Sequence, residues 1–373
     1  MSKWKQGRID IDPTAAAYDP SRIDMLARHC ERLLDAGTIQ AAGFLMSRGG
    51  KIFAHQTAGR RTREADSEPF RPEHIKNVAS VSKVFTATAI MRLAEEGKLW
   101  LEQPVKTIIP EFDTPLHSAI HIRHLLTHTS GLAADGGYYL EPYPIEGWEE
   151  TRGADWLKKS VLAGPLQGEV GKQWNYCSKG FGVLGEIVSR VSGMHFNDYV
   201  EKNVLAPIGM ERSFLEVPKK HWTEVLLSAE WDPLALEHAG DRAGMPNGGG
   251  GVYSTLYDLF RFGQCYLNGG TLDGARLLGK KAIAEMTSNQ LDGIPAFHWG
   301  KKFRSFRHGL GWDLFCDGAF VGPKTYLHEG WGWSSLFIDP EEDFVYASMA
   351  ATPTEWSADV MVNPRCIAFA GLL

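Results

Sequence analysis

The stretch Asn77-Val78-Ala79-Ser80-Val81-Ser82-Lys83 decides how the rest of this chain is interpreted, because it opens a long apolar run. In a helix, Ser80 and Lys83 lie on one face, one turn apart. The first turn of a helix carries unsatisfied N–H groups and positive potential, which disfavours an ammonium ion and favours an alkoxide. A desolvated lysine there loses its charge near neutral pH and accepts the serine proton. The pair therefore predicts a nucleophile together with its base.

The spacing alone is weak evidence, since Ser2-Lys3-Trp4-Lys5 shares it at a polar terminus. The context of Ser80 is different. Residues 84–94 are largely apolar and Gly97 follows them, which predicts a buried helix with a glycine stop. A second interpretation stays open, because serine is a common N-cap residue and Ser80 could simply begin this helix.

Composition limits the class of protein. A chain of 373 residues is too long for one simple core and predicts two domains. The net charge of −6, without a basic tract, argues against a nucleic-acid partner. No apolar stretch approaches the length of a membrane span, and the first residues lack the apolar core of a signal peptide, so no membrane partner is expected.

The cysteines indicate a reducing compartment. They are odd in number and show no C-x-x-C spacing, which predicts reduced, mostly buried thiols. We therefore expect a cytoplasmic protein, whose oligomeric state the sequence does not indicate. The residues concerned are Cys30, Cys177, Cys265, Cys316 and Cys366.

Strand signals gather at both ends of the chain, with helical signals between them. Residues 42–47 and 51–57 predict a hairpin around Gly49-Gly50, after a helix over 21–36 that Ser21 would cap. Strands are expected again at 324–328, 334–338 and 344–349. A helix over 256–267 precedes them, and the helical tail that follows is interrupted at Pro364.

This order predicts an α/β domain built from both termini, with a mainly helical domain inserted into it. The expected boundaries are 1–78 with 248–373 for the first domain and 79–247 for the second, with a site in the cleft between them. A loop over 133–149 carries Tyr138, Tyr139, Tyr143 and Trp148, and loops of this length are often functional.

Two further motifs carry possible chemistry. Tyr176, on a turn before a helical pattern, can point into a cleft and relay a proton if positive charge lowers its pKa. Alternatively, Tyr176 only packs in the core, which is the interpretation favoured for Tyr266, because Tyr266 continues the apolar side of the helix predicted over 256–267. In His328-Glu329-Gly330-Trp331 the glycine lets a substrate lie beside the strand, and backbone N–H groups could hold an oxyanion. There a structural histidine is the alternative.

Metal chemistry is not favoured. His121, His124 and His128 have helical spacing, but no carboxylate shares their face. An amphipathic helix ending at Ser130-Gly131 explains them better, and no metal or other cofactor is expected. The chain also lacks G-x-S-x-G, the nucleophile elbow of α/β-hydrolases.

Taken in order, these motifs resemble the serine β-lactamase and penicillin-binding-protein superfamily, above all class C β-lactamases and family VIII carboxylesterases. The resemblance covers nearly the whole chain, and its most specific stretches are residues 77–83, 122–132, 205–210 and 249–255. It implies an α/β (α+β) fold with an antiparallel sheet flanked by helices.

The resemblance also implies roles for individual residues. Ser80 would be the acylated nucleophile, Lys83 the proton acceptor and Tyr176 the tyrosine of the family's Tyr-x-Asn motif. Ser178 stands where that motif has asparagine, and His328-Glu329-Gly330 stands where β-lactamases have Lys-Thr-Gly. These two positions belong to substrate binding, and the second change is similar to the esterase branch.

The oxyanion hole implied by the resemblance consists of the N–H groups of Ser80 and Trp331. An alternative register, centred on Trp331-Gly332-Trp333, would move the second donor by a few residues. Gly330 is part of the same strand end. Trp174, Trp331 and Trp333 could form an apolar wall for a short acyl chain.

We therefore expect a serine hydrolase, a carboxylesterase that cleaves short-chain esters through a covalent acyl-serine. Three alternatives remain at this stage. A β-lactamase or D-amino-acid peptidase would use the same site on an amide, an acyltransferase would pass the acyl group to another acceptor, and a penicillin-binding module would acylate without turnover.

Overall fold

The computed structural model describes residues 3–135, 152–228, 232–298, 301–303, 306–314, 320–352 and 357–373. Most of the predicted aromatic loop over 133–149, including its four aromatic residues, lies outside the described residues, as does Cys316.

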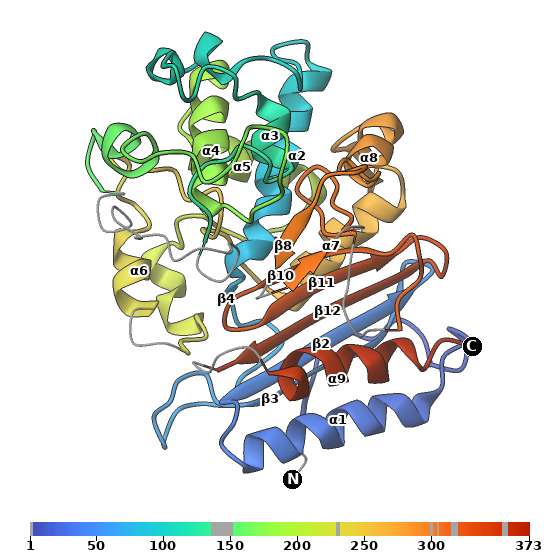
Figure 1. Cartoon of the computed structure of the whole chain (residues 1–373). Helices are drawn as coiled ribbons and strands as arrows, with labels where there is room; N and C mark the ends of the chain where they lie inside the picture. Colours follow the sequence, from blue (N-terminus) through green and yellow to red (C-terminus); the bar gives the residue numbers. More distant parts are fainter. Residues whose placement is uncertain are drawn as a thin grey trace.

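A six-stranded antiparallel sheet forms the centre of the fold, in the order β1-β3-β2-β12-β11-β10. Its strands come from both ends of the chain, and β2 pairs directly with β12 (Figure 1). The predicted antiparallel sheet, flanked by helices and built from both termini, is thereby confirmed. The strands are β1 (Lys5–Gln6), β2 (Ala41–Arg48), β3 (Lys51–Gly59), β10 (Tyr326–Gly330), β11 (Ser334–Asp339) and β12 (Phe344–Ala351).

Two helices cover one face of this sheet and a third packs on the other. Helices α1 (Pro20–Asp35) and α9 (Ala358–Phe369) lie side by side across the first face (Figure 1). Helix α7 (Leu256–Leu267) packs against β11 and β12 from the opposite side. Above that side lie α2 (Ser82–Glu95), α3 (Ile122–Leu126), α4 (Ser178–Ser192) and α5 (Phe196–Val200).

Helix α2 is buried on nearly all sides and runs through the largest apolar cluster. Such a helix belongs in the interior of a protein, which gives its first turn a fixed position. The short remaining elements are β4 (Lys76–Asn77), β5 (Tyr253–Ser254), β6 (Thr271–Leu272), β7 (Ala275–Arg276), β8 (Ala296–His298), β9 (Lys301–Phe303), α6 (Asp232–His238) and α8 (Lys280–Met286).

Two local predictions are confirmed. Gly49 and Gly50, with φ of 58° and 71°, make the predicted hairpin turn between β2 and β3, because glycine adopts these angles without strain. Helix α7 spans Leu256–Leu267, as predicted, and Tyr266 is buried in the core.

Two others are wrong. Asp19, not Ser21, caps α1, since its Oδ1 accepts the Ser21 N–H at 2.9 Å. Helix α9 continues through Pro364 instead of breaking there. Its buried residues Val360, Met361 and Ala368 pack under the sheet, and this packing outweighs the hydrogen bond that a proline removes.

None of the helices in the described part of the chain is long and apolar enough to cross a membrane.

Candidate active site

Ser80 lies in a tight turn that leads into α2. A short 3₁₀ helix, Ala79–Val81, precedes α2, and no side chain caps either helix, so the interpretation of Ser80 as an N-cap is wrong. Ala79 has a left-handed φ of 46°, and the Asn77 Oδ1 accepts its N–H at 2.8 Å. Strained backbone of this kind persists only where neighbours enforce it, and it clusters at functional sites.

Lys83 is fully buried one turn further along the chain. Its Nζ lies 3.1 Å from Ser80 Oγ, 2.9 Å from Ser178 Oγ and 2.9 Å from the carbonyl oxygen of Gly249. Burial lowers the pKa of Lys83 to about 8, and the charge of Asp135 opposes this shift. A lysine with this pKa is partly uncharged at neutral pH and can accept a proton from the serine beside it.

Ser178, the first residue of α4, connects Lys83 to a buried carboxylate. Its hydroxyl donates to Asp135 Oδ2 at 2.6 Å, and its backbone N–H donates to Asp135 Oδ1 at 2.8 Å. Burial raises the pKa of Asp135, whereas Lys83 and the bonds from Ser178 hold it down. Ser178 thus bridges the Lys83 amine and the Asp135 carboxylate.

Tyr176 closes the site from the α4 side. The Lys83 Nζ lies 4.6 Å from the centre of its ring, a distance typical of cation–π contact when the lysine is charged. His128 holds the turn on both sides of this tyrosine. Its carbonyl accepts the Asn175 N–H at 2.9 Å, and its Nδ1 accepts the Cys177 N–H at 3.0 Å.

The histidine series does not form one helix. Helix α3 ends at Leu126, and His128 has a left-handed φ of 56°, so the predicted helix as far as Ser130-Gly131 is wrong. His121 and His124 stack on each other, while the His128 ring packs against Tyr176 at a tilt of 31°, with ring centres 4.4 Å apart. No group of three His, Cys, Asp or Glu side chains among the described residues could hold a metal ion.

Strand β10 brings Gly330 against the nucleophile turn. A Cβ atom at position 330 would lie 2.0 Å from the Val78 carbonyl oxygen and 3.0 Å from Ser80 N. Only glycine permits this approach, and Trp331 follows it at the beginning of the turn to β11. The predicted oxyanion donors, the N–H groups of Ser80 and Trp331, therefore belong to backbone segments that meet at this point.

His328 does not supply a positive charge to the site. Its ring is buried, its Nδ1 contacts the Glu329 carbonyl oxygen at 2.8 Å, and burial lowers its pKa to about 4. Glu329 points to the other face of the sheet, where Arg365 Nη1 donates to its Oε1 at 2.8 Å. The strand is thereby tied to α9.

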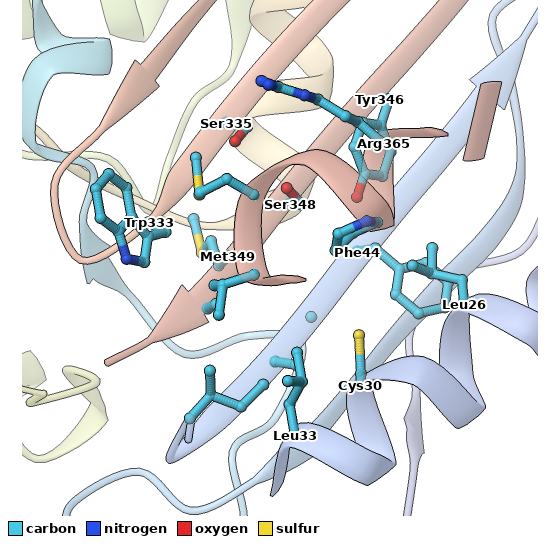
Figure 2. Close-up of a pocket in the computed structure, with 17 residues that line it drawn as sticks. Leu26, Cys30, Leu33, Phe44, Trp333, Ser335, Tyr346, Ser348, Met349 and Arg365 are labelled. Atoms are coloured by element: carbon cyan, nitrogen blue, oxygen red, sulfur yellow. The ribbon is translucent and has the colours of Figure 1, made fainter. Parts of the chain in front are cut away.

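The predicted wall of three tryptophans is found only in part, since Trp331 and Trp333 contact each other with ring centres 5.3 Å apart. Trp174 is buried against Phe306, with ring centres 4.6 Å apart. Trp333 lines a small cavity on the α1 and α9 face of the sheet, together with Arg365 (Figure 2). At about 30 Å³ that cavity holds about one water molecule and no substrate. Trp331, which is 45% exposed, is left as a candidate contact for the acyl chain.

A larger cavity of about 350 Å³ adjoins the nucleophile turn. Asn77, whose side chain also bonds to Ala79 N–H and to the Gly250 carbonyl, forms part of its wall. His195, Asn197, His238 and Asn247 give it a polar lining. This volume is within the usual range of small-molecule sites.

Comparison with known proteins gives the family. A family model described as Beta-lactamase matches residues 26–363, so the chain belongs to the Beta-lactamase family. Penicillin-binding protein 4* of Bacillus subtilis is 31% identical over 356 residues, which cover 89% of this chain and 72% of that protein. Esterase EstB of Burkholderia gladioli is 28% identical over 291 residues, covering 66% and 73%. A putative D-alanyl-D-alanine carboxypeptidase of Escherichia coli K12 is 23% identical over 398 residues, covering 95% and 88%.

Solved structures agree on the fold. A family VIII carboxylesterase superposes with a TM-score of 0.74 at 22% identity, covering 95% of this chain and 98% of that one. A class C beta-lactamase mutant superposes with a TM-score of 0.73 at 19% identity, covering 94% and 97%. At these identities the likeness establishes the shared fold, including the arrangement of sheet and helices described above.

The structure brings together four of the residues selected from the sequence, because Ser80, Tyr176 and Ser178 surround the amine of Lys83. Gly330 and Trp331 adjoin Ser80 through the backbone, and the His328 ring lies behind Tyr176 with ring centres 6.4 Å apart. Sequence reasoning missed Asp135 and the role of His128 in holding Tyr176. Their only signal is that both lie in or directly after the motif over residues 122–132.

Proposed function

We propose that this protein is a serine hydrolase of the carboxylesterase type, which cleaves short-chain esters through an acyl-Ser80 intermediate. The observation that carries the proposal is the 3.1 Å distance between Ser80 Oγ and the buried Nζ of Lys83. Burial leaves part of the Lys83 population uncharged near neutral pH, which is the state that a general base requires.

The proposed reaction has two halves. Lys83 accepts the Ser80 proton while Oγ attacks the ester carbonyl, and the N–H groups of Ser80 and Trp331 stabilise the oxyanion. Collapse of the tetrahedral intermediate breaks the bond to the alcohol, which receives the proton by way of Tyr176. Water then attacks the acyl carbon, the acid leaves, and Ser80 regains its proton.

The neutral state of His328 supports an ester over a β-lactam. In the β-lactamases that this sequence resembles, a lysine at this strand position provides a cation for the substrate carboxylate. Here the position holds a buried imidazole whose pKa of about 4 leaves it uncharged at neutral pH. A neutral substrate loses nothing by this change, whereas an anionic one loses a charge-assisted hydrogen bond.

Two substrates test the proposal. p-Nitrophenyl butyrate should be hydrolysed with a larger kcat/KM than nitrocefin, and Ser80→Ala should abolish its hydrolysis. A fluorophosphonate adduct located on Ser80 by mass spectrometry identifies the nucleophile. Faster turnover of nitrocefin would indicate a β-lactamase and not an esterase. Transfer of butyrate to an added alcohol at the expense of hydrolysis would indicate an acyltransferase. Stoichiometric labelling without turnover would indicate a binding module.

A further inference from the structure

The hydroxyl of Ser178 has one proton, and the structure directs it to Asp135. Ser178 Oγ donates to Asp135 Oδ2 at 2.6 Å, while Ser178 N–H donates to Oδ1 at 2.8 Å. Both oxygens of the carboxylate are therefore acceptors, as in an ionised group. Ser178 Oγ has only lone pairs left for Lys83 Nζ, which lies 2.9 Å away.

Among the described residues, Lys83 Nζ is hydrogen-bonded to three oxygen atoms, and two of them can only accept. One is Ser178 Oγ, and the other is the carbonyl oxygen of Gly249 at 2.9 Å. An uncharged amine has two N–H bonds and one lone pair. When the N–H bonds are donated to these two acceptors, the lone pair faces the third neighbour, Ser80 Oγ, at 3.1 Å.

We propose that Asp135 is a positioning residue, which holds the Ser178 hydroxyl proton so that the lone pair of uncharged Lys83 is left for Ser80. This inference rests on the proposed function, in which Lys83 is the base. Without the carboxylate, the Ser178 hydroxyl rotates and donates to Lys83, where it competes with Ser80. With Asp135 in place, Ser178 orients the base and does not donate a hydrogen bond to the substrate.

Charged and titratable groups surround Lys83 and Asp135. The effect of Asp135 on Lys83 is electrostatic as well as geometric, because the carboxylate opposes the fall in the lysine pKa. A neutral amide at position 135 lowers that pKa further and moves the acid limb of Ser80 reactivity to lower pH. The other groups that act on Lys83 are Cys177, Asp313 and the rings of Tyr176, His128 and His328. Lys179, on α4, acts on Asp135.

The rate at which a fluorophosphonate labels Ser80, followed across pH, tests this proposal without requiring ester turnover. Asp135→Asn should slow labelling by about 10- to 100-fold, the cost of one misdirected hydrogen bond to the base, and shift the acid limb to lower pH. Ser178→Ala should slow it less, because that variant has no hydroxyl to misdirect. The double variant should label no more slowly than Ser178→Ala alone.

Asp258→Asn is the matched control. Asp258 is a buried carboxylate that also accepts a serine hydroxyl, from Ser213 at 2.8 Å, and a backbone N–H, from Arg212 at 2.9 Å. Its replacement should leave both the labelling rate and the acid limb unchanged, although it lowers thermal stability. A shift of the limb in this variant would overturn the proposal, because the shift would then not depend on Asp135.

Other outcomes also overturn it. Losses that multiply in the double variant would show that Asp135 acts independently of Ser178, and an unmoved acid limb in Asp135→Asn would show that its charge does not reach Lys83. If Asp135→Asn fails to fold by circular dichroism, Ser178→Ala decides the question. A loss above about 100-fold would then show that the hydroxyl itself is required.

The two proposals fail in distinguishable ways. Wild-type protein that labels on Ser80 but cleaves no ester refutes the esterase and leaves the labelling comparison to decide on Asp135. Wild-type protein that does not label on Ser80 refutes both.

Discussion

Gly330 lies so close to Val78 that no side chain fits between them: a Cβ atom at position 330 would be 2.0 Å from the Val78 carbonyl oxygen. This contact joins the end of β10 to the turn that carries Ser80. The position of the strand end, and of the Trp331 N–H that follows it, therefore depends on the absence of one methyl group.

Gly330→Ala should push the strand end away from Ser80. We expect kcat/KM for a butyrate ester to fall by about 100-fold, since a displacement of about 1 Å has this effect on a positioned group. Overpacking should also lower the free energy of unfolding by about 1–3 kcal/mol. Gly168→Ala is the control, because the nearest atoms to a Cβ there are 3.9 Å away. Unchanged kcat/KM in Gly330→Ala would refute an oxyanion hole at this strand.

The pH profile should report the base. Lys83 accepts a proton only when uncharged, and burial lowers its pKa to about 8. We therefore expect kcat/KM to rise with pH and to reach half of its plateau near this value, with Ser80→Ala as the background. In Lys83→Arg the guanidinium stays protonated and cannot act as the base, so activity should fall by about 1,000-fold at every pH. A flat wild-type profile between about pH 6 and 9 would contradict this role.

His128 should matter through the turn it holds. His128→Ala removes the acceptor for the buried Cys177 N–H, which costs about 1–3 kcal/mol of stability and releases Tyr176. His128→Asn should lose less, since asparagine retains a side-chain acceptor and tolerates the left-handed φ of 56°. Urea unfolding and kcat measure the two effects. Equal losses in both variants would show that the acceptor is unimportant.

The ion pair of Glu329 and Arg365, whose side chains are 25% and 5% exposed, should stabilise β10 from the far face of the sheet. Arg365→Met leaves this partly buried carboxylate without its cation and should lower the free energy of unfolding by about 1–3 kcal/mol at neutral pH. Burial already raises the pKa of Glu329, and the loss of Arg365 raises it further. As pH rises, Glu329 loses its proton at a lower pH in the unfolded chain than in the folded variant. The loss of stability is therefore absent below about pH 4 and grows as pH rises above it.

Two variants complete that experiment. Adding Glu329→Gln to Arg365→Met removes the unpaired charge and should restore most of the stability at neutral pH. Arg242→Ala breaks exposed ion pairs with Asp198 and Glu216 and should cost at most about 1 kcal/mol, because all three side chains are more than 40% exposed. A cost in Arg365→Met that does not vary with pH would indicate lost packing and not an unpaired charge.

Local patterns predicted the parts of the site that lie close together in the sequence. Ser80 and Lys83 are one helical turn apart, and the β2–β3 hairpin is encoded by its glycine pair, so both followed from spacing. Asp135 and Ser178 are 43 residues apart, and their contact depends on how the segment after α3 packs against the start of α4. No periodicity carries that information.

The failed prediction for Trp333 has a different cause. Trp333 has a left-handed φ of 70°, after Gly332 at 75°, and its side chain packs on the α1 and α9 face of the sheet. A non-glycine residue rarely adopts this conformation, so the residue type gave no indication of it. The domain boundaries and the expected compartment stay predictions.

The pairing of β2 with β12 has a consequence for synthesis of the protein. Arg48 and Glu342, at the end of this ladder, are bonded although 294 residues separate them. Strand β2 is synthesised long before its partner β12, and contacts of such long range make folding slow. Gly330 lies far along the chain from Ser80, so the close contact between their backbone segments can form only after β10 has been synthesised.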